Sequence, residues 1–213
     1  MGQTNSRPKC GIIVCNPDLD IALIPQLCSN RICAAVMQQP TPIYIICAYF
    51  PPDDEDETCI NKLANAIQKT NSNQIIISCD LNAKSPIWFH TREDKRGRLV
   101  ADLMNLHDLI STNMTTLSTF YTPHAEGWTD VCLVSNELSH RITNCETMLV
   151  LSVSDHKFIV THISDILTSL HLKTQQVSRT NCELCRELFG QQWKITTFPL
   201  STSRRNWTNM PIT

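Results

Sequence analysis

Two polar residues follow directly after an apolar run in the first half of the chain. Asp80 and Asn82 come after Gln74–Cys79, and strand alternation would place both side chains on one side if the strand continued. Functional polar groups often lie where a buried strand ends, and a carboxylate and an amide there could share one substrate. The alternative is that the two residues begin a turn.

A second group is Ser154-Asp155-His156, which immediately precedes the apolar run Lys157–His162. A histidine can donate or accept a proton near neutral pH, and a neighbouring carboxylate can fix its tautomer or bind a metal ion. The alternative is a turn made by Ser154 and Asp155 with His156 half-buried beside it.

A third candidate is Asp130, an acid within the apolar stretch Trp128–Ser135. Burying a lone carboxylate costs several kcal/mol, so such a residue must be paired or hydrogen-bonded. His156 is the obvious partner, which predicts that the two side chains lie within hydrogen-bond reach. A strand-end acid that faces water is the alternative.

The elements that would position these residues are mainly strands. Short apolar or β-branched runs bounded by Pro, Asn, Asp and Ser predict strands at Lys9–Cys15, Arg31–Met37, Ile43–Tyr49 and Gln74–Cys79. Helical spacing at Ile60, Leu63, Ala64 and Ile67 predicts an amphipathic helix. A leucine stripe predicts a second helix at Arg96–His107.

The second half is predicted to add more strands and then a change of character. Strands are expected at Leu109–Ser111, Thr119–Tyr121, Trp128–Ser135, Thr147–Val153 and Lys157–His162. Two polar, helix-like segments follow at Asp165–Gln175 and Cys182–Gln191. We therefore divide the chain into a domain at 9–163 and a polar, partly helical C-terminal appendage at 164–213.

Composition narrows the class of protein. The 213 residues carry 18 Lys and Arg against 20 Asp and Glu, a net charge of −2, and 42% are hydrophobic, which excludes a disordered chain. No apolar run approaches the roughly 20 residues of a membrane span, and the polar start lacks a secretory core. We expect an intracellular protein, nuclear or cytoplasmic and not secreted, with its 11 cysteines reduced.

One local basic segment stands out against this near-neutral charge. It comprises His90, Arg92, Lys95, Arg96 and Arg98. Such a segment could contact DNA phosphates, and a solvated loop is the alternative.

The order and spacing of the polar groups resemble the endonuclease/exonuclease/phosphatase superfamily. More narrowly, residues 75–88 followed by Lys95–Leu99 resemble the apurinic/apyrimidinic-type endonuclease domain of non-LTR, LINE-type retrotransposons. Residues Ala48–Pro52 resemble the signature that follows the central strand of that family. The resemblance covers about Gly11 to Ile163.

This resemblance implies a Mg²⁺-dependent phosphodiesterase, with Mn²⁺ as an alternative ion, that nicks DNA to prime reverse transcription. The implied fold is an α/β, four-layered sandwich of two β-sheets flanked by helices. DNA is the implied partner, with no membrane span and no obligate protein partner.

The resemblance also implies a role for each candidate residue. Asp80 orients or deprotonates the attacking water, and Asn82 hydrogen-bonds the phosphate. Asp130 and His156 form the pair that stabilises the pentacovalent phosphate. The last two are Tyr49, whose hydroxyl contacts phosphate, and Asp155, the acid beside the metal.

The chain also departs from the family pattern. The family's first strand with its Asn, and a later strand whose Glu is the principal metal ligand, are not found, so we expect a domain that lacks its N-terminal strands and has impaired activity. A non-catalytic remnant that binds DNA or protein is the alternative. Cys79 and Phe89 stand where glycines are common, which predicts altered backbone approach to the phosphate.

Overall fold

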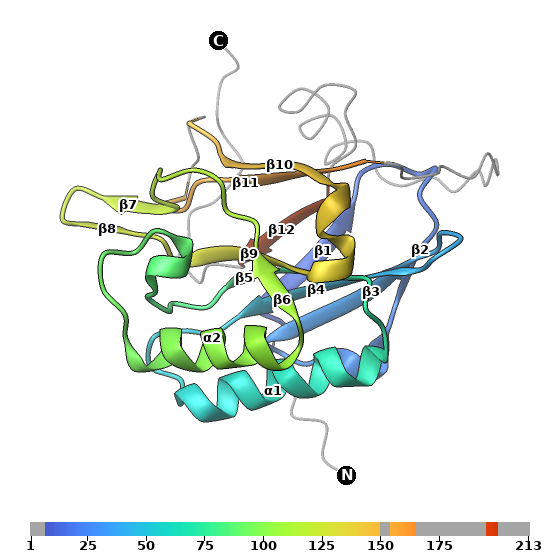
Figure 1. The fold of residues 1–213 in the computed structure, drawn as a ribbon, viewed down its shortest axis with the longest axis horizontal. Helices are drawn as coiled ribbons and strands as arrows, with labels where there is room; N and C mark the ends of the chain where they lie inside the picture. The colour runs from blue at the N-terminus through green and yellow to red at the C-terminus, as the bar shows by residue number, and fades with distance from the viewer. Residues whose placement is uncertain (1–6, 150–153, 165–194, 200–213) are drawn as a thin grey trace.

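The computed structural model describes residues 7–149, 154–164 and 195–199. Its centre is a six-stranded sheet in the spatial order β2-β3-β4-β5-β9-β6 (Figure 1). The strands are β2 (Ile21–Leu23), β3 (Ile32–Met37), β4 (Ile43–Tyr49), β5 (Ile75–Asp80), β9 (Asp130–Ser135) and β6 (Leu109–Ser111). Only β4 and β5 pair in parallel, and the helix α1 (Asp56–Thr70) connects them.

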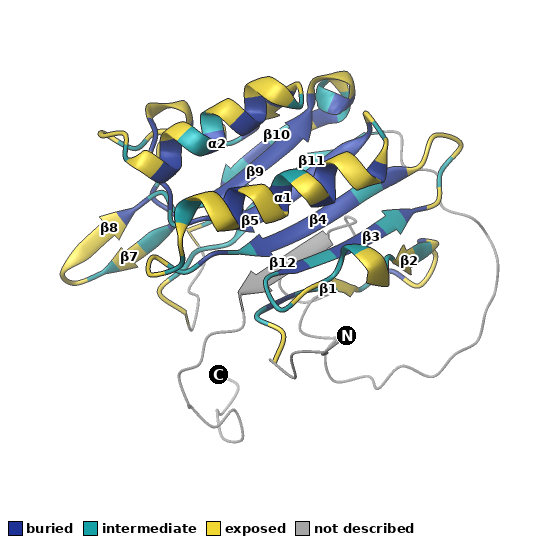
Figure 2. Cartoon of the chain, turned by 90° about the horizontal axis from the view of Figure 1, so that it is seen from below, coloured by how far each residue is buried: buried dark blue, intermediate teal, exposed yellow. Residues whose placement is uncertain are grey.

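Two helices cover one face of this sheet (Figures 1 and 2). The helix α1 buries a stripe that includes Ile60, Leu63 and Ile67, and α2 (Lys95–Leu106) buries Val100 and Leu103. These side chains form one apolar cluster with residues such as Ile46 and Ile77 from the sheet. Burial of these stripes explains why both helices form where the apolar spacing predicts them.

The other face of the sheet carries two short antiparallel ladders. One pairs β10 (Ile142–Thr147) with β11 (Ile159–Ile163), and the other pairs β1 (Cys10–Val14) with β12 (Ile195–Pro199). Alternate residues of the central strands, such as Ile45, Ile76 and Cys132, form a second apolar cluster on this side. The sheet is therefore buried on both faces, which matches the near-continuous apolar runs of its central strands.

The remaining elements are short. A hairpin of β7 (Phe120–Thr122) and β8 (Ala125–Gly127) projects from the margin (Figure 1). The 3-10 helices are η1 (Pro25–Leu27), η2 (Pro86–Trp88) and η3 (Asn136–Arg141). No described helix is long and apolar enough to cross a membrane.

The mixed α/β class predicted from sequence is confirmed, and in the described residues the helices lie on one face of the sheet and the ladders on the other. The bounds of β4 and β6 match the prediction. A strand was predicted to begin at Thr147 and run to Val153. This prediction is wrong in its described part, because β10 runs from Ile142 and ends at Thr147. Strands β2 and β8, which have three residues each, were not predicted.

Several predictions concern residues that the structure does not describe. The segments Asp165–Gln175 and Cys182–Gln191 lie outside the described residues. The described strand β12 belongs to the predicted appendage and pairs with β1. The division into a domain at 9–163 and an appendage at 164–213 stays a prediction.

Candidate active site

Two carboxylates stand side by side at one end of the central sheet. Asp80 is the last residue of β5 and Asp130 is the first residue of β9, and they are direct partners in the antiparallel register. Side chains two or four residues apart in a strand lie on the same face, so Asp80 shares a face with Ile76 and Asp130 shares one with Cys132. Both carboxylates therefore lie on the face that packs against the ladders. Sheet register alone therefore brings together two acids that are 50 residues apart in sequence.

His156 completes this group from the loop that precedes β11. Its Nδ1 lies 2.8 Å from Asp130 Oδ2, which confirms the predicted pair, and its Nε2 lies 4.0 Å from Asp80 Oδ2. An isolated bridge to Phe120 holds the backbone of His156, and the two rings are 5.1 Å apart. The alternative of a turn at Ser154 and Asp155 is also partly correct, because the Ser154 hydroxyl accepts a hydrogen bond from the His156 backbone N–H.

Three further side chains, which sequence reasoning missed, fix the position of Asp130. The buried Thr119 hydroxyl oxygen accepts hydrogen bonds from the backbone N–H groups of Thr129 and Asp130, at 3.1 Å each. The Thr129 hydroxyl donates to Asp130 Oδ2 at 3.0 Å. Asn113 donates to the Asp130 carbonyl and accepts from the Cys132 N–H. Asn113 thus extends the β6–β9 ladder with its side-chain amide after β6 has ended.

Asn82 is turned toward Asp80. Its Nδ2 donates to Asp80 Oδ1 at 3.0 Å and to the Phe50 carbonyl at 3.2 Å. Its backbone has φ of 48°, in the left-handed region that Asn tolerates better than most residues. The sequence Asp-x-Asn therefore makes both a local turn and a pair of neighbouring polar groups.

Tyr49 lies beside Asp80, its register partner across the parallel β4–β5 pair. The Arg31 guanidinium lies 5.7 Å from the centre of the Tyr49 ring. Two contacts of 3.1 Å to Asp54 hold Arg31 in place. Arg31 is thus a cation beside Tyr49 that no sequence motif indicated.

Asp155 is placed differently from the other candidates. It is exposed, and it adds no ligand atom to the cluster of Asp80, Asp130 and His156. Its backbone carbonyl accepts a hydrogen bond from the Tyr121 N–H. The structure thus brings Asp155 next to the cluster only through its neighbour His156.

The electrostatics of the cluster follow from burial and from like charge. Burial, and then the negative charge of Asp130, raise the pKa of Asp80 to about 7. Burial works against the charged form of His156, but the hydrogen bond and charge of Asp130 outweigh it and raise the pKa of that imidazole. Burial and the nearby Asp80 likewise raise the pKa of Tyr49.

The donor set fits a divalent cation. Ligand atoms of Asp80, Asp130 and His156 lie within 4.8 Å of one another, and they form the one such group found among the described residues. Asp80 and Asp130 also raise each other's cost of ionisation, as the raised pKa of Asp80 indicates after burial, and a bound cation would offset that repulsion. Carboxylate oxygens suit Mg²⁺ or Mn²⁺, and both ions accept water at their remaining positions.

One residue of the basic segment at positions 90–98 is structural, which corrects part of the DNA-contact interpretation. Arg96 is buried and bonds to the Asp56 carboxylate at 2.6 Å. It also donates to five backbone carbonyls, those of Phe50, Pro51, Pro52, Asp54 and Leu81. Lys95 pairs with Glu57, and Arg98 lies 3.9 Å from Glu93. Arg96 is therefore not available to DNA phosphates.

The residue after Arg96 has to be glycine. A Cβ atom on Gly97 would lie 1.8 Å from the backbone oxygen of Lys84. Asp94 caps α2 at Gly97 N and also accepts from Lys84 N, so the loop after Asn82 packs directly against the start of the helix.

Cys79 and Phe89 stand where glycines are common in the family, and the structure accommodates the two side chains in different ways. Cys79 packs in the helix-facing cluster and donates to the Val131 carbonyl at 3.2 Å, so its side chain does not crowd the face that carries Asp80. Phe89 does adopt a conformation that favours glycine, with φ of 71°.

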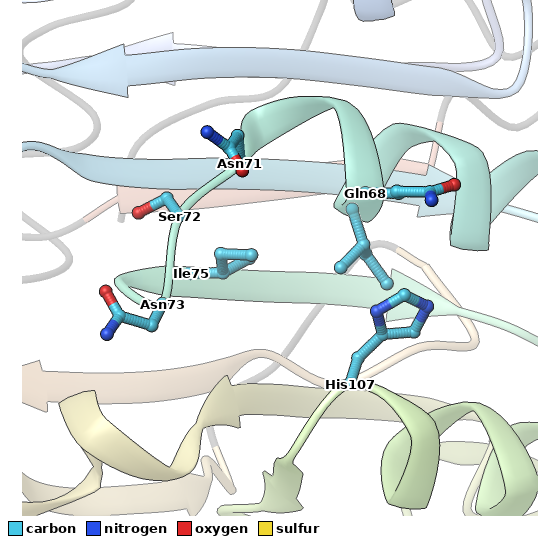
Figure 3. A pocket seen from close by; sticks show the side chains of 7 residues that line it. Gln68, Asn71, Ser72, Asn73, Ile75 and His107 are labelled. Carbon is cyan, nitrogen blue, oxygen red and sulfur yellow. The ribbon is translucent and has the colours of Figure 1, made fainter.

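A cavity of about 420 Å³ is also present in the described part of the chain, and Figure 3 shows the side chains that line it. It is lined by the end of α1, the start of β5 and His107. Ile75 begins β5 and Asp80 ends it, so roughly 16 Å of strand separates the cavity from the carboxylates. The cavity is not part of the candidate site.

Comparison with known proteins assigns the chain to a family. Residues 43–160, more than half of the chain, match the family model described as endonuclease-reverse transcriptase. The chain belongs to this family. It is a retrotransposon endonuclease-like domain of the endonuclease/exonuclease/phosphatase superfamily, as its sequence motifs predict.

Solved structures show the same fold for this endonuclease-like domain. The endonuclease domain of TRAS1, a telomere-specific non-LTR retrotransposon, is 24% identical with a TM-score of 0.66, and the match covers 70% of each chain. The AP endonuclease LMAP of Leishmania major is 12% identical with a TM-score of 0.54, over 63% of this chain and 55% of that one.

A 3'-5' exonuclease from Neisseria meningitidis is 15% identical with a TM-score of 0.53, over 68% of this chain and 70% of that one. No curated protein matches the sequence significantly.

Proposed function

We propose that this domain is a divalent-metal-dependent phosphodiesterase that nicks DNA. The observation that carries the proposal is the cluster of Asp80, Asp130 and His156, in which a paired imidazole and a second carboxylate lie within 4.8 Å. Phosphodiester cleavage needs a base or positioning group for water and positive charge for the developing oxyanion, and this cluster offers both.

Each candidate residue has a role that its position supports. Asp80, with a pKa of about 7, accepts a proton from water or orients it near neutral pH. His156, whose charged form Asp130 favours by raising its pKa, donates from Nε2 to a phosphoryl oxygen. We assign the Asn82 amide and the Tyr49 hydroxyl to the same phosphate, which requires Asn82 Nδ2 to exchange a present bond to Asp80 or to the Phe50 carbonyl. Asp155 adds negative charge beside the metal site through its neighbour His156.

Asp80 and Asp130 would hold Mg²⁺, or Mn²⁺ in its place. When bound, the ion supplies Lewis-acid stabilisation of charge on the phosphoryl oxygens. The cluster includes no glutamate among the described residues. Loss of one charge-stabilising group typically lowers a rate by about 10²–10³, so we propose slow turnover on a DNA substrate. In a retrotransposon such a nick would prime reverse transcription, and the site of action would be the nucleus or the cytoplasm.

A non-catalytic, DNA-binding role is the second candidate, and one observation favours it. The Asp80 side chain is only 3% exposed, and its pKa of about 7 leaves it half protonated at neutral pH without a metal. A carboxylate that is buried and neutral is a poor metal ligand.

The experiment that separates the two candidates is a supercoiled-plasmid nicking assay in Mg²⁺, in Mn²⁺ and in EDTA. We expect slow nicking that requires the metal and that falls at least tenfold in the His156→Ala and Asp80→Asn variants. The matched control is His140→Ala, which changes a histidine in η3, away from the cluster. Nicking that persists in His156→Ala would reject the assigned site, and no nicking with intact DNA binding would favour the second candidate.

A further inference from the structure

The loop after Asn82 presents two apolar side chains to solvent beside the candidate site. Ile87 is 48% exposed and Phe89 is 36% exposed, while Trp88 between them is fully buried. Exposed large apolar side chains that gather in one place mark a binding surface more often than single ones do. We call Ile87 and Phe89 the apolar pair.

The backbone under this pair is held rigidly. Trp88 Nε1 donates to the Ala83 carbonyl at 3.2 Å, and the Ser85 hydroxyl oxygen caps η2 by accepting from Ile87 N. The His90 N–H donates to the Ser85 carbonyl. Within this frame Phe89 occupies the left-handed region, which costs a non-glycine residue about 1–2 kcal/mol. The strained backbone of Phe89 ends η2 and holds an exposed phenyl ring at the surface.

Cations flank the apolar pair. Lys84 and Arg92 are both exposed, and among the described residues neither forms a side-chain ion pair. The acids of this loop are engaged elsewhere, since Asp94 caps α2 and Glu93 lies near Arg98. Burial, and then the charges of Lys84 and Arg92, lower the pKa of His90, although Asp94 acts in the other direction. Lys84 and Arg92 are therefore two exposed cations of this loop whose side chains are paired with no described acid.

The loop also lies next to the catalytic candidates. The ring of His90 packs edge-on against Trp128 at 5.7 Å, and Trp128 is two residues before Asp130. A polyanion bound at Asp130 and His156 would extend over this loop.

We propose that Ile87 and Phe89 form an apolar wedge that contacts the bases of duplex DNA, while Lys84 and Arg92 bind the flanking phosphates. The inference rests on the proposed function, because it takes DNA as the substrate of the neighbouring cluster. Apolar side chains between cations suit this partner, since a duplex offers apolar base steps between two rows of phosphates.

The test measures DNA binding without cleavage. Fluorescence anisotropy of a labelled duplex in EDTA gives Kd at several salt concentrations for the wild-type chain and three variants. Phe89→Gly removes the ring at a backbone position that suits glycine. The double variant Lys84→Gln/Arg92→Gln removes the flanking charges. Leu106→Ala is the matched control, because Leu106 is 76% exposed at the far end of α2.

The wedge predicts different results for the variants. Phe89→Gly should raise Kd on the order of tenfold, with an unchanged slope of log K against log[salt], because stacking on a base does not release counterions. The double variant should reduce the magnitude of that slope by about 1.8, or about 0.9 for each lost phosphate contact. Leu106→Ala should bind as the wild-type chain does.

Other results of the binding experiment would overturn the wedge, while the nicking assay decides the proposed function separately. Wild-type affinity in Phe89→Gly, equal weakening in Leu106→Ala, or no binding of any form in EDTA would each overturn it. Metal-dependent nicking that is lost in His156→Ala, together with wild-type DNA affinity in Phe89→Gly, would support the proposed function while removing the wedge.

Discussion

Asp80 and Asp130 occupy directly opposed positions on the antiparallel strands β5 and β9, with both carboxylates on the face that packs against the ladders. Like charges at directly opposed positions destabilise a sheet. The fold therefore places electrostatic repulsion at its proposed catalytic centre, and His156 relieves part of it through Asp130. A bound cation, or protonation of a carboxylate, would relieve the remaining repulsion.

The first prediction concerns stability and pH in the absence of metal. The pKa of Asp80 is about 7 in the folded chain against an ordinary value of 3.8, so the folded state binds more protons between these values. The stabilisation is complete below about pH 4 and is lost as pH rises through about 7. Its magnitude is on the order of a few kcal/mol.

Urea unfolding in EDTA at pH 4, 5.5, 7 and 8 measures this effect. The charge of the whole chain changes with pH, so the informative quantity is the free energy of unfolding of the wild-type chain minus that of Asp80→Asn. We expect this difference to fall with rising pH. A constant difference would show that Asp80 ionises normally.

The second prediction concerns divalent metal. At pH 8 Asp80 is ionised, and Mg²⁺ or Mn²⁺ should raise the free energy of unfolding by about 2.7 kcal/mol at roughly 100 times its Kd. Differential scanning fluorimetry across a metal titration would detect the shift in Tm. The shift should vanish in Asp80→Asn and persist in Asp53→Asn, an exposed acid in the loop after β4. Equal shifts in both variants would place the metal elsewhere.

The third prediction concerns the strained backbone at Phe89. Replacing Phe89 by Gly removes the steric cost of φ at 71°, offset by the entropy that glycine loses on folding. We expect Phe89→Gly to be more stable than the wild-type chain by up to about 1 kcal/mol in urea unfolding. Phe89→Ala should show no such gain, because alanine keeps the strain. A less stable Phe89→Gly would mean that the ring contributes more to packing than its exposure indicates.

The fourth prediction concerns Arg96. Replacing it by Lys keeps the charge but cannot satisfy the Asp56 carboxylate and five carbonyls at once, so about 3 kcal/mol or more of stability should be lost. Arg98→Lys is the matched control, because Arg98 is exposed and makes one long contact to Glu93. Its effect should stay within about 0.5 kcal/mol. Similar losses for the two variants would contradict the structural role.

The sequence predicted the central strands, both helices and the Asp130–His156 pair, because each depends on local periodicity or on the cost of burying one charge. The side chains that hydrogen-bond to Asp130 and its backbone were not predictable in the same way. Asn113 lies in a stretch rich in Ser, Thr and Asn, and Thr119 begins a short predicted strand. Only the register of β9 decides that these two side chains bond to its backbone. Arg96 was misjudged because a basic segment looks the same whether it faces DNA or five carbonyls.

The contacts of Arg96 also determine how the molecule can open. One guanidinium bonds to carbonyls just beyond the ends of β4 and β5, while its backbone begins α2. The loop after β4, the Asp80–Asn82 turn and the first turn of α2 therefore cannot detach one at a time without breaking the same set of bonds. These three segments form a single cooperative unit in local unfolding, and Asp80 and Asn82 lose their arrangement only when the whole unit opens.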